Sequence, residues 1–292
     1  MHEDSLSRKI FVICNTFILL TLVAATLYPV WYVLCASFSN YDQLIATKGF
    51  LLWPKGFTTV AYELLLRNPM IYSGFRNTAI IVSSTLVLNL IMTTLGAYFL
   101  TRKNVFWRDF FMMAIVFTMY FSGGFIPFYF TVRQLHMDGT FLALIIPGAI
   151  STYNLIVLRT AFAAVPDSLE ESARLDGAGH LSIIKNVYIP LTLPTMAVIL
   201  LYYFVSHWNA WFGATIFLRD RGMFPLQVIL REILLQNSTE DMLIGTGFDQ
   251  TNQVSELIKY ALIIVSILPV ICLYPFIQRF FVKGVMIGAV KG

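Results

Sequence analysis

Long apolar runs alternate with shorter polar segments along the whole chain. Six of these runs carry almost no charged residue, and they reach or nearly reach the roughly 20 residues that a helix needs to cross the hydrocarbon core of a bilayer. The pattern therefore predicts an all-α membrane protein, with 1–292 forming one transmembrane domain of six membrane-spanning helices. The expected spans are about 10–38, 77–101, 110–132, 139–162, 193–218 and 258–279.

The composition agrees with a protein that lies in a bilayer. Hydrophobic residues make up 58% of the chain and charged residues 12%, whereas soluble domains carry about 25% charged residues. Arg8 and Lys9 precede the first apolar run as in a signal peptide, but that run is longer than the roughly 7–15 apolar residues of a cleaved signal. We therefore expect an uncleaved first helix and a multi-pass protein of the cell membrane, surrounded by lipid.

A charged loop over 166–192, containing two glycines, separates the fourth and fifth expected spans. Ser168 and Glu171 fit the S-x-x-E capping box, which predicts a short helix over 169–176. Gly177 is expected to end this helix, because glycine readily adopts the backbone conformation that follows a helix C-terminus.

A second helical stretch is expected later in the same loop. Leu181, Ile184 and Tyr188 recur at helical spacing and form an apolar side, and Pro190 is expected to break the helix. The loop is thus predicted to be a helix, a bend and a second helix that protrude from the bilayer as a docking surface. A simpler interpretation is a capped, solvated connection between two spans.

The order of residues in this loop resembles a known family motif. Glu171-Ser172-Ala173 is followed by Gly177 and then by Val187-Tyr188-Ile189-Pro190, which resembles the E-A-A, G, I-x-L-P cytoplasmic loop of ATP-binding-cassette importer permeases. Ser172 stands in place of the first alanine, and Val187 and Ile189 in place of Ile and Leu, which are size-tolerant changes. The resemblance implies a coupling helix that seats in a cleft of a separate ATPase subunit.

The resemblance also implies which residues make this contact. Ala173 and Gly177 would allow close approach, and Glu170 or Glu171 would pair with a basic residue of the ATPase. The expected coupling residues are Glu170, Glu171, Ser172, Ala173, Asp176, Gly177, Ile189 and Pro190.

Three further segments resemble the carbohydrate-uptake branch of these permeases, which includes maltose-type and oligosaccharide or polysaccharide permeases. They are the tail over 280–292, the segment Phe121–Pro127 and the segment Trp208–Phe212. In that branch the tail reaches between the two ATPase subunits, which implies that Lys291 and Gly292 contact the ATPase. Composition alone favours a frayed basic end at the membrane surface, and the ATPase contact becomes the preferred interpretation only in combination with the loop.

Polar and aromatic side chains inside the expected spans are candidates for the translocation path of a sugar. Buried amides at membrane depth should face protein or water rather than lipid. The same residue types also form interfacial belts and bridges between helices, so both interpretations remain open. The candidates are Asn89, Tyr120, Asn154, His207, Trp208, Asn209 and Trp211.

The sequence lacks the residues that several other functions would need. No glycine is followed by lysine, so the chain has no G-x-x-x-x-G-K-[ST] phosphate-binding loop and is not expected to hydrolyse ATP. We expect no catalytic residue, no metal site, no cofactor in this chain and no nucleic-acid partner. The resemblance implies instead a companion permease, two ATPase subunits that bind ATP and Mg²⁺, an extracytoplasmic solute-binding protein and a carbohydrate substrate.

The distribution of positive charge indicates the orientation of the chain. Arg102, Lys103 and Arg108 crowd the short connection between the second and third spans, and such juxtamembrane positive charges favour the cytoplasmic side. This orientation places both termini and the loop over 166–192 in the cytoplasm.

Other classes of membrane protein are less well supported. An intramembrane enzyme needs paired acids, a nucleophile with a positioned histidine or a metal cluster, and His207 is the one histidine within the expected spans. A stand-alone secondary transporter usually has an intramembrane ionisable residue or inverted repeats, and neither is visible. An importer permease of the same family for a non-sugar solute remains an alternative.

Overall fold

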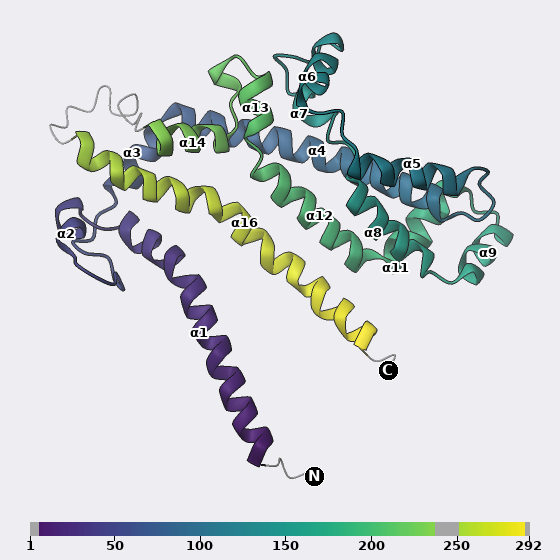
Figure 1. The fold of residues 1–292 in the computed structure, drawn as a ribbon, viewed down its shortest axis with the longest axis horizontal. Coiled ribbons are helices and arrows are strands. Elements are labelled where there is room, and N and C mark those ends of the chain that lie inside the picture. Colours follow the sequence, from purple (N-terminus) through teal and green to yellow (C-terminus); the bar gives the residue numbers. More distant parts are fainter. Residues whose placement is uncertain (1–5, 237–250, 290–292) are drawn as a thin grey trace. The chain divides into compact units, whose positions relative to one another are not determined.

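The computed structural model describes residues 6–236 and 251–289, and helices are the only regular secondary structure across these two ranges (Figure 1). The described chain falls into two compact units. One comprises 1–71 and 230–268, and the other comprises 72–229 and 269–292. The expected all-α class is confirmed.

The first unit begins with α1 (Leu6–Ser37) and continues with α2 (Tyr41–Ala46) and α3 (Val60–Arg67). Cys35, Ala36 and Leu51 form a small buried cluster at the end of α1. The Ser37 and Tyr62 hydroxyl groups lie 2.7 Å apart, which links α1 to α3.

Three of the expected spans are continuous helices that are long and apolar enough to cross a membrane. These segments are Ser7–Ser37 in α1, Pro69–Thr101, which is the whole of α4, and Glu256–Phe276 within α16 (Thr251–Ala289). Their continuity follows from local chemistry, because each is a long apolar run with at most two charged residues in its most hydrophobic window.

The expected span over 110–132 is not one continuous helix. It forms α5 (Arg108–Tyr120) and α6 (Phe125–Gln134), whose axes differ by 114°. Gly124 between them has a φ of +82°, a value that a right-handed helix cannot contain. The glycine pair at 123–124 therefore divides an apolar run that its hydropathy alone would join.

The expected span over 139–162 is also interrupted. It contains α7 (Leu142–Ile145) and α8 (Thr152–Ala163). Pro147 and Gly148 lie in the gap, where proline removes a helical N–H donor. The Ser151 side chain then caps α8 by accepting from the Asn154 N–H at 3.4 Å.

The expected span over 193–218 is divided into α12 (Leu193–Trp208) and α13 (Phe212–Phe217). The Asn209 side chain donates to the Val205 carbonyl at 2.9 Å, so it competes locally with continued backbone hydrogen bonding. After α13 the chain forms a short 3₁₀ turn, η2 (Arg221–Met223), and then α14 (Leu226–Gln236).

The loop over 166–192 folds as a helix, a bend and a second helical stretch, as expected. The first helix is α9 (Asp167–Leu175), and Gly177 follows it with a φ of +80°. The second stretch consists of α10 (His180–Ile183), the π-helical turn η1 (Ile184–Tyr188) and α11 (Ile189–Leu191).

Two local predictions for this loop are wrong. The S-x-x-E capping box does not form, because α9 begins two residues earlier than expected, with Pro166 as its N-cap and Ser168 inside the first turn. Pro190 does not break the second stretch, because it lies in the first turn of α11, where a missing N–H costs little. The chain instead bends by 88° at Thr192, between α11 and α12.

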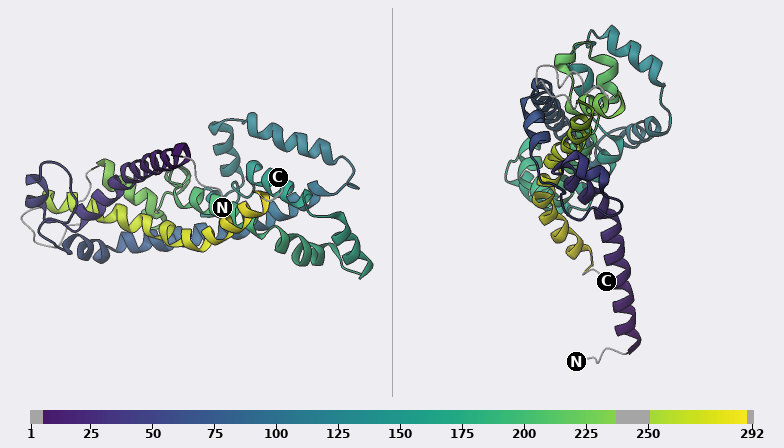
Figure 2. Two further views of the ribbon diagram at one scale, coloured as in Figure 1. Left: turned by 90° about the horizontal axis from the view of Figure 1, so that it is seen from below. Right: turned by 90° about the vertical axis from the view of Figure 1, so that its left-hand side faces the viewer.

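A buried cluster of the second unit holds the 166–192 segment in place. Tyr98 of α4, Phe162 of α8, Tyr188 of η1 and Tyr203 of α12 all belong to this cluster. α9 lies at one end of this unit (Figures 1 and 2), where it projects beyond α8. The core thus fixes the base of the segment while its tip remains exposed.

Candidate functional site

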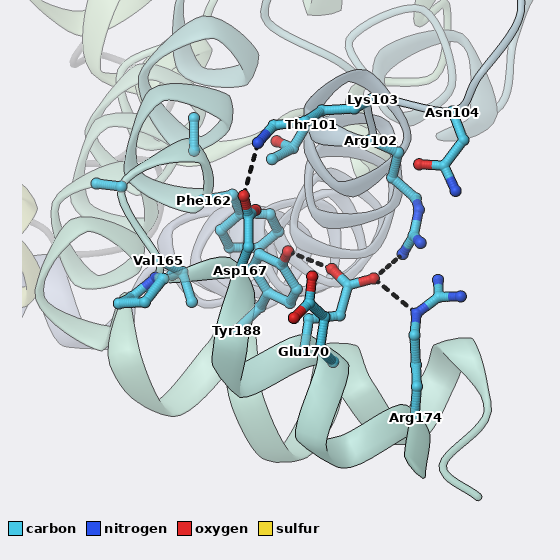
Figure 3. Close-up of a pocket in the computed structure, with 14 residues that line it drawn as sticks. Thr101, Arg102, Lys103, Asn104, Phe162, Val165, Asp167, Glu170, Arg174 and Tyr188 are labelled. Atoms are coloured by element: carbon cyan, nitrogen blue, oxygen red, sulfur yellow. Dashed lines mark hydrogen bonds and ion pairs between the residues drawn. The ribbon is translucent and has the colours of Figure 1, made fainter.

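The Glu170 carboxylate is the centre of a polar network beside α9 (Figure 3). It lies 2.7 Å from the Arg102 guanidinium and 3.0 Å from Nε of Arg174, and it accepts a 2.6 Å hydrogen bond from the Tyr188 hydroxyl. The Glu170 side chain is only 16% exposed. Three partners therefore neutralise and hold a largely buried carboxylate, as buried charges require.

The partners of Glu170 come from three parts of the chain. Arg102 directly follows α4, Arg174 lies one turn further along α9, and Tyr188 ends η1. The Tyr188 ring packs against Phe162 at a centroid distance of 4.9 Å. The network thus joins α9 to the end of α4 and to the stretch that leads into α12.

Tyr188 is a permanent hydrogen-bond donor at neutral pH. It belongs to the polar segment outside the expected spans, and its burial together with its hydrogen bond to Glu170 raises the pKa of its phenol above the ordinary value. The neutral phenol donates to the Glu170 carboxylate, whereas a phenolate next to this carboxylate would be repelled.

A second ion pair joins the same two segments at the surface. Lys103 Nζ lies 2.6 Å from the Asp167 carboxylate, and both side chains are exposed (Figure 3). Together with the Glu170 network it borders a polar cavity of about 620 Å³. Solvent screens exposed pairs strongly, so Glu170 rather than Asp167 carries the main connection.

The residues expected to couple to an ATPase divide into two groups. Glu171, Ser172, Asp176, Gly177 and Pro190 are exposed, whereas Ala173 and Ile189 pack in part against the buried cluster. Glu170 faces inward and has its partners within the chain. The fold therefore decides which of the two adjacent glutamates is available to another protein.

Two leucines beside the bend are unusually exposed. Leu175 at the end of α9 is 90% exposed, and Leu181 in α10 is 75% exposed. They lie on either side of Gly177, around which a Cβ atom would meet nothing within 4 Å. The tip of the segment thus presents two apolar side chains and open space around Gly177.

The sequence reasoning missed Arg102, Arg174 and Tyr188 as partners of Glu170. The four-residue spacing of Glu170 and Arg174 is a readable signal for a helical ion pair. The other two partners depend on the tertiary fold. The tail residues Lys291 and Gly292, expected to contact an ATPase, lie outside the described residues.

Two of the candidates for the translocation path hold a helix break together. The fully buried Asn89 of α4 donates to the Gly148 carbonyl in the gap between α7 and α8, and its Oδ1 lies 2.9 Å from Nε2 of His207. Asn89 thus satisfies a backbone carbonyl that the break leaves without a helical partner. This arrangement is a bridge between helices.

Tyr203 supports the same break, although sequence reasoning did not single it out. Its hydroxyl lies 2.8 Å from that of Thr93 and accepts a 2.9 Å hydrogen bond from the Ser151 N–H. No signal in the sequence separates Tyr203 from the neighbouring tyrosine in the same apolar run. The pairing follows only from the packing of α4, α8 and α12.

The remaining path candidates are scattered. Trp208 is buried and stacks on Phe204, Tyr120 is exposed on α5, and Asn209 and Trp211 lie in the gap after α12. Asn154 and His207 line one cavity.

The chain combines long apolar helices and broken helix pairs with an exposed polar segment between α8 and α12. These features define a multi-pass membrane protein. Residues 93–287 match the family described as "Binding-protein-dependent transport system inner membrane component". The chain belongs to this family, which is a family of permease subunits rather than ATPases.

Individual relatives agree with this assignment. The chain is 38% identical over 267 residues, 90% of its length and 92% of the relative's, to the polygalacturonan/rhamnogalacturonan transport system permease protein YtcP of Bacillus subtilis. It is 27% identical to the maltodextrin transport system permease protein MdxG of the same organism, over 99% of both chains. The resemblance to the carbohydrate branch of ATP-binding-cassette importer permeases is confirmed.

A solved structure supports the fold in detail. The chain matches one chain of a bacterial ABC transporter "involved in the import of the acidic polysaccharide alginate" with a TM-score of 0.88 and 32% identity. The match covers 96% of this chain and 100% of that chain. The broken helices described above therefore belong to a fold seen in an importer permease.

Proposed function

We propose that this chain is a membrane-spanning subunit of an ATP-driven importer for oligosaccharides or polysaccharide fragments. The observation that carries this proposal is the similarity, over nine-tenths of the chain, to a permease named for polygalacturonan and rhamnogalacturonan transport. The alginate importer chain and the maltodextrin permease, to which this chain is also similar, are likewise named for carbohydrate transport. The sugar crosses by alternating access, driven by ATP hydrolysis in partner subunits.

The proposed topology has six spans in one transmembrane domain over 1–292. α1, α4 and α16 are three of them, the bent pair α5–α6 supports a fourth, α12 with α13 supports a fifth, and α7 with α8 supplies the sixth. The 166–192 segment and both termini lie in the cytoplasm. The positive charge of Arg102, Lys103 and Arg108 in the short connection between α4 and α5 supports this orientation.

The coupling surface is the exposed tip of the 166–192 segment. Glu171, Ser172 and Asp176 supply polar contacts, and Leu175 and Leu181 supply the apolar ones. In this proposal Glu171 pairs with a basic residue of the ATPase, because Glu170 is already held by Arg102 and Tyr188. Seating of this tip in the ATPase passes its movement to α12 through the η1–α11 stretch.

The complete importer requires partners. A companion permease completes the transmembrane pathway, two ATPase subunits bind ATP and Mg²⁺, and an extracytoplasmic solute-binding protein delivers the sugar. The tail over 280–292, including Lys291 and Gly292, adds a second contact with the ATPase. These partners follow from the family, and this chain contributes the path and the coupling surface.

The experiment that tests the proposal is co-purification of the tagged chain with its partners from membranes in mild detergent. Wild type should bring a second permease and an ATPase. Leu175→Glu and Leu181→Glu should lose the ATPase and keep the companion permease, because a buried unpaired charge opposes docking. Leu135→Glu, a similarly exposed leucine outside this segment, is the matched control and should keep both.

Uptake of labelled oligosaccharides by cells that contain the complete importer completes the test. A chain that purifies folded and alone, or that supports uptake without any ATPase, contradicts the proposal and favours a stand-alone transporter. An assembled importer that takes up no sugar contradicts the substrate class only.

A further inference from the structure

A second cavity, of about 520 Å³, lies against the break between α7 and α8. α8 contributes Tyr153 and Asn154 to its wall, and α12 contributes Tyr202, Ser206 and His207. The volume falls within the roughly 300–1,000 Å³ of typical small-molecule sites. The cavity shares no lining residue with the polar cavity beside Glu170.

The rings of two tyrosines in the cavity wall pack against each other at a tilted angle. The Tyr153 and Tyr202 ring centroids are 6.2 Å apart, with an angle of 47° between the ring planes. Tyr153 is 53% exposed and Tyr202 is 46% exposed. Aromatic surface of Tyr153 on α8 and of Tyr202 on α12 thus remains accessible, while other side chains of these two helices are buried in the core.

Hydrogen-bonding groups lie next to these rings. Ser206 is exposed, one helical turn after Tyr202 on α12. Asn154 is only 4% exposed and lines the cavity, yet its side-chain amide makes no hydrogen bond within the described ranges 6–236 and 251–289. A buried amide normally has a partner, so Asn154 has hydrogen-bonding capacity left for a molecule in the cavity.

The wall of the cavity is held by its own hydrogen bonds. Tyr203 fixes the Ser151 N–H, and Asn89 fixes both His207 and the Gly148 carbonyl. A site with such a prearranged wall loses less conformational freedom when it binds a ligand.

The chemistry of the lining selects the class of ligand. It combines three tyrosine rings and one imidazole with hydroxyl and amide groups, and it contains no Asp, Glu, Lys or Arg. A pyranose ring matches this lining, because its C–H face can lie on an aromatic ring while its hydroxyls bond to Ser206 and Asn154. The lack of charge also keeps binding weak enough for release, which transport requires.

We propose that this cavity is a sugar-binding site on the translocation path, in which Tyr153 and Tyr202 stack against sugar rings and Asn154 and Ser206 bond to their hydroxyls. The inference rests on the proposed function and adds to it the residues that hold the sugar in this subunit. It also assigns different roles to neighbours, because Tyr202 binds the sugar whereas Tyr203 holds the helix break.

The test uses the complete importer, reconstituted with its binding protein and trapped with vanadate. The probes are tritiated trigalacturonate, maltotriose and arabinotriose, and the readouts are the labelled sugar retained per complex and the uptake rate. Tyr153→Ala and Tyr202→Ala should each lower retention by roughly three- to tenfold, which corresponds to the loss of one aromatic contact. Tyr153→Phe and Tyr202→Phe should retain most of the sugar.

Tyr274→Ala is the matched control, because Tyr274 is a comparably exposed tyrosine of α16 that does not line this cavity. Unchanged retention in the two alanine variants overturns the inference, as does an equal loss in the phenylalanine variants. Loss of the companion permease from the alanine variants also overturns it, since the rings would then belong to a subunit interface. A wild-type importer that carries none of the three sugars contradicts the proposed function and the inference together.

Discussion

The Arg102 guanidinium lies 2.7 Å from the Glu170 carboxylate and thereby ties the end of α4 to α9. Glu171, the next residue, is exposed. Two adjacent glutamates therefore differ in their surroundings, because Glu170 anchors α9 to its own chain whereas Glu171 points to the surface.

Glu170→Gln should weaken this anchor. Loss of a charge-assisted hydrogen bond at a largely buried position costs on the order of 1.5–3 kcal/mol, so the variant should unfold at a lower temperature in detergent and should hydrolyse ATP without matching sugar uptake. Asp167→Asn, which removes the exposed pair with Lys103, is the control and should change the unfolding temperature little.

Glu171→Gln should show the opposite pattern. The unfolding temperature should stay at the wild-type value because the Glu171 side chain is exposed, while recovery of the ATPase in co-purification should fall. Equal destabilisation of the Glu170 and Glu171 variants would contradict the assignment of separate roles. Restoration of coupling by the double exchange Arg102→Glu with Glu170→Arg would support the ion pair directly.

Tyr188→Phe should destabilise the protein by about 1–3 kcal/mol at neutral pH, because it removes the hydrogen bond to Glu170 and keeps the ring packing. The raised pKa of Tyr188 gives this effect a defined pH dependence. The neutral phenol is favoured by the fold, so its contribution is complete below the unfolded-state pKa of about 10 and declines as the pH rises above it. Thermal unfolding between pH 8 and pH 11 should show the difference between the two proteins shrinking at the alkaline end, and a difference that grows there would refute the account.

Gly177→Val should disturb the bend after α9. The φ of Gly177 is +80°, and a residue with a Cβ pays about 1–2 kcal/mol in this left-handed region. Because the surrounding space is open, the effect is conformational, and ATPase recovery should fall while membrane insertion is preserved. Gly179→Ala is the control, since Gly179 has a φ of −73° and equally open surroundings; a comparable loss in that variant would mean that the bend conformation is not the cause.

Asn89→Ala should destabilise the break between α7 and α8. It leaves the partly buried Gly148 carbonyl and His207 without their partner, at a cost of about 1–3 kcal/mol. Asn209→Ala removes an exposed bond to the Val205 carbonyl and should cost much less. Thermal unfolding in detergent compares the two, and similar values for both variants would exclude a special role for Asn89.

At the helix breaks, the sequence contains local helix-breaking residues, but the hydropathy of the surrounding apolar runs predicts continuous helices. Gly123 and Gly124 divide α5 from α6, and Pro147 with Gly148 divides α7 from α8. Each pair is a normal breaker, yet the apolar runs around them continue on both sides. Hydropathy shows whether a segment suits the bilayer but not whether it is one continuous helix. Spans predicted from hydropathy alone therefore contain no breaks.

By itself, the amino-acid sequence determined the membrane class, the long helices α1, α4 and α16, the bend at Gly177 and the permease family. These features depend on local composition and on residues close together in the chain. Only the tertiary structure decided that Glu170 faces inward and that Asn89 supports a helix break 59 residues away. The direction of a polar side chain depends on partners from distant segments, and those partners are brought together only when the helices pack.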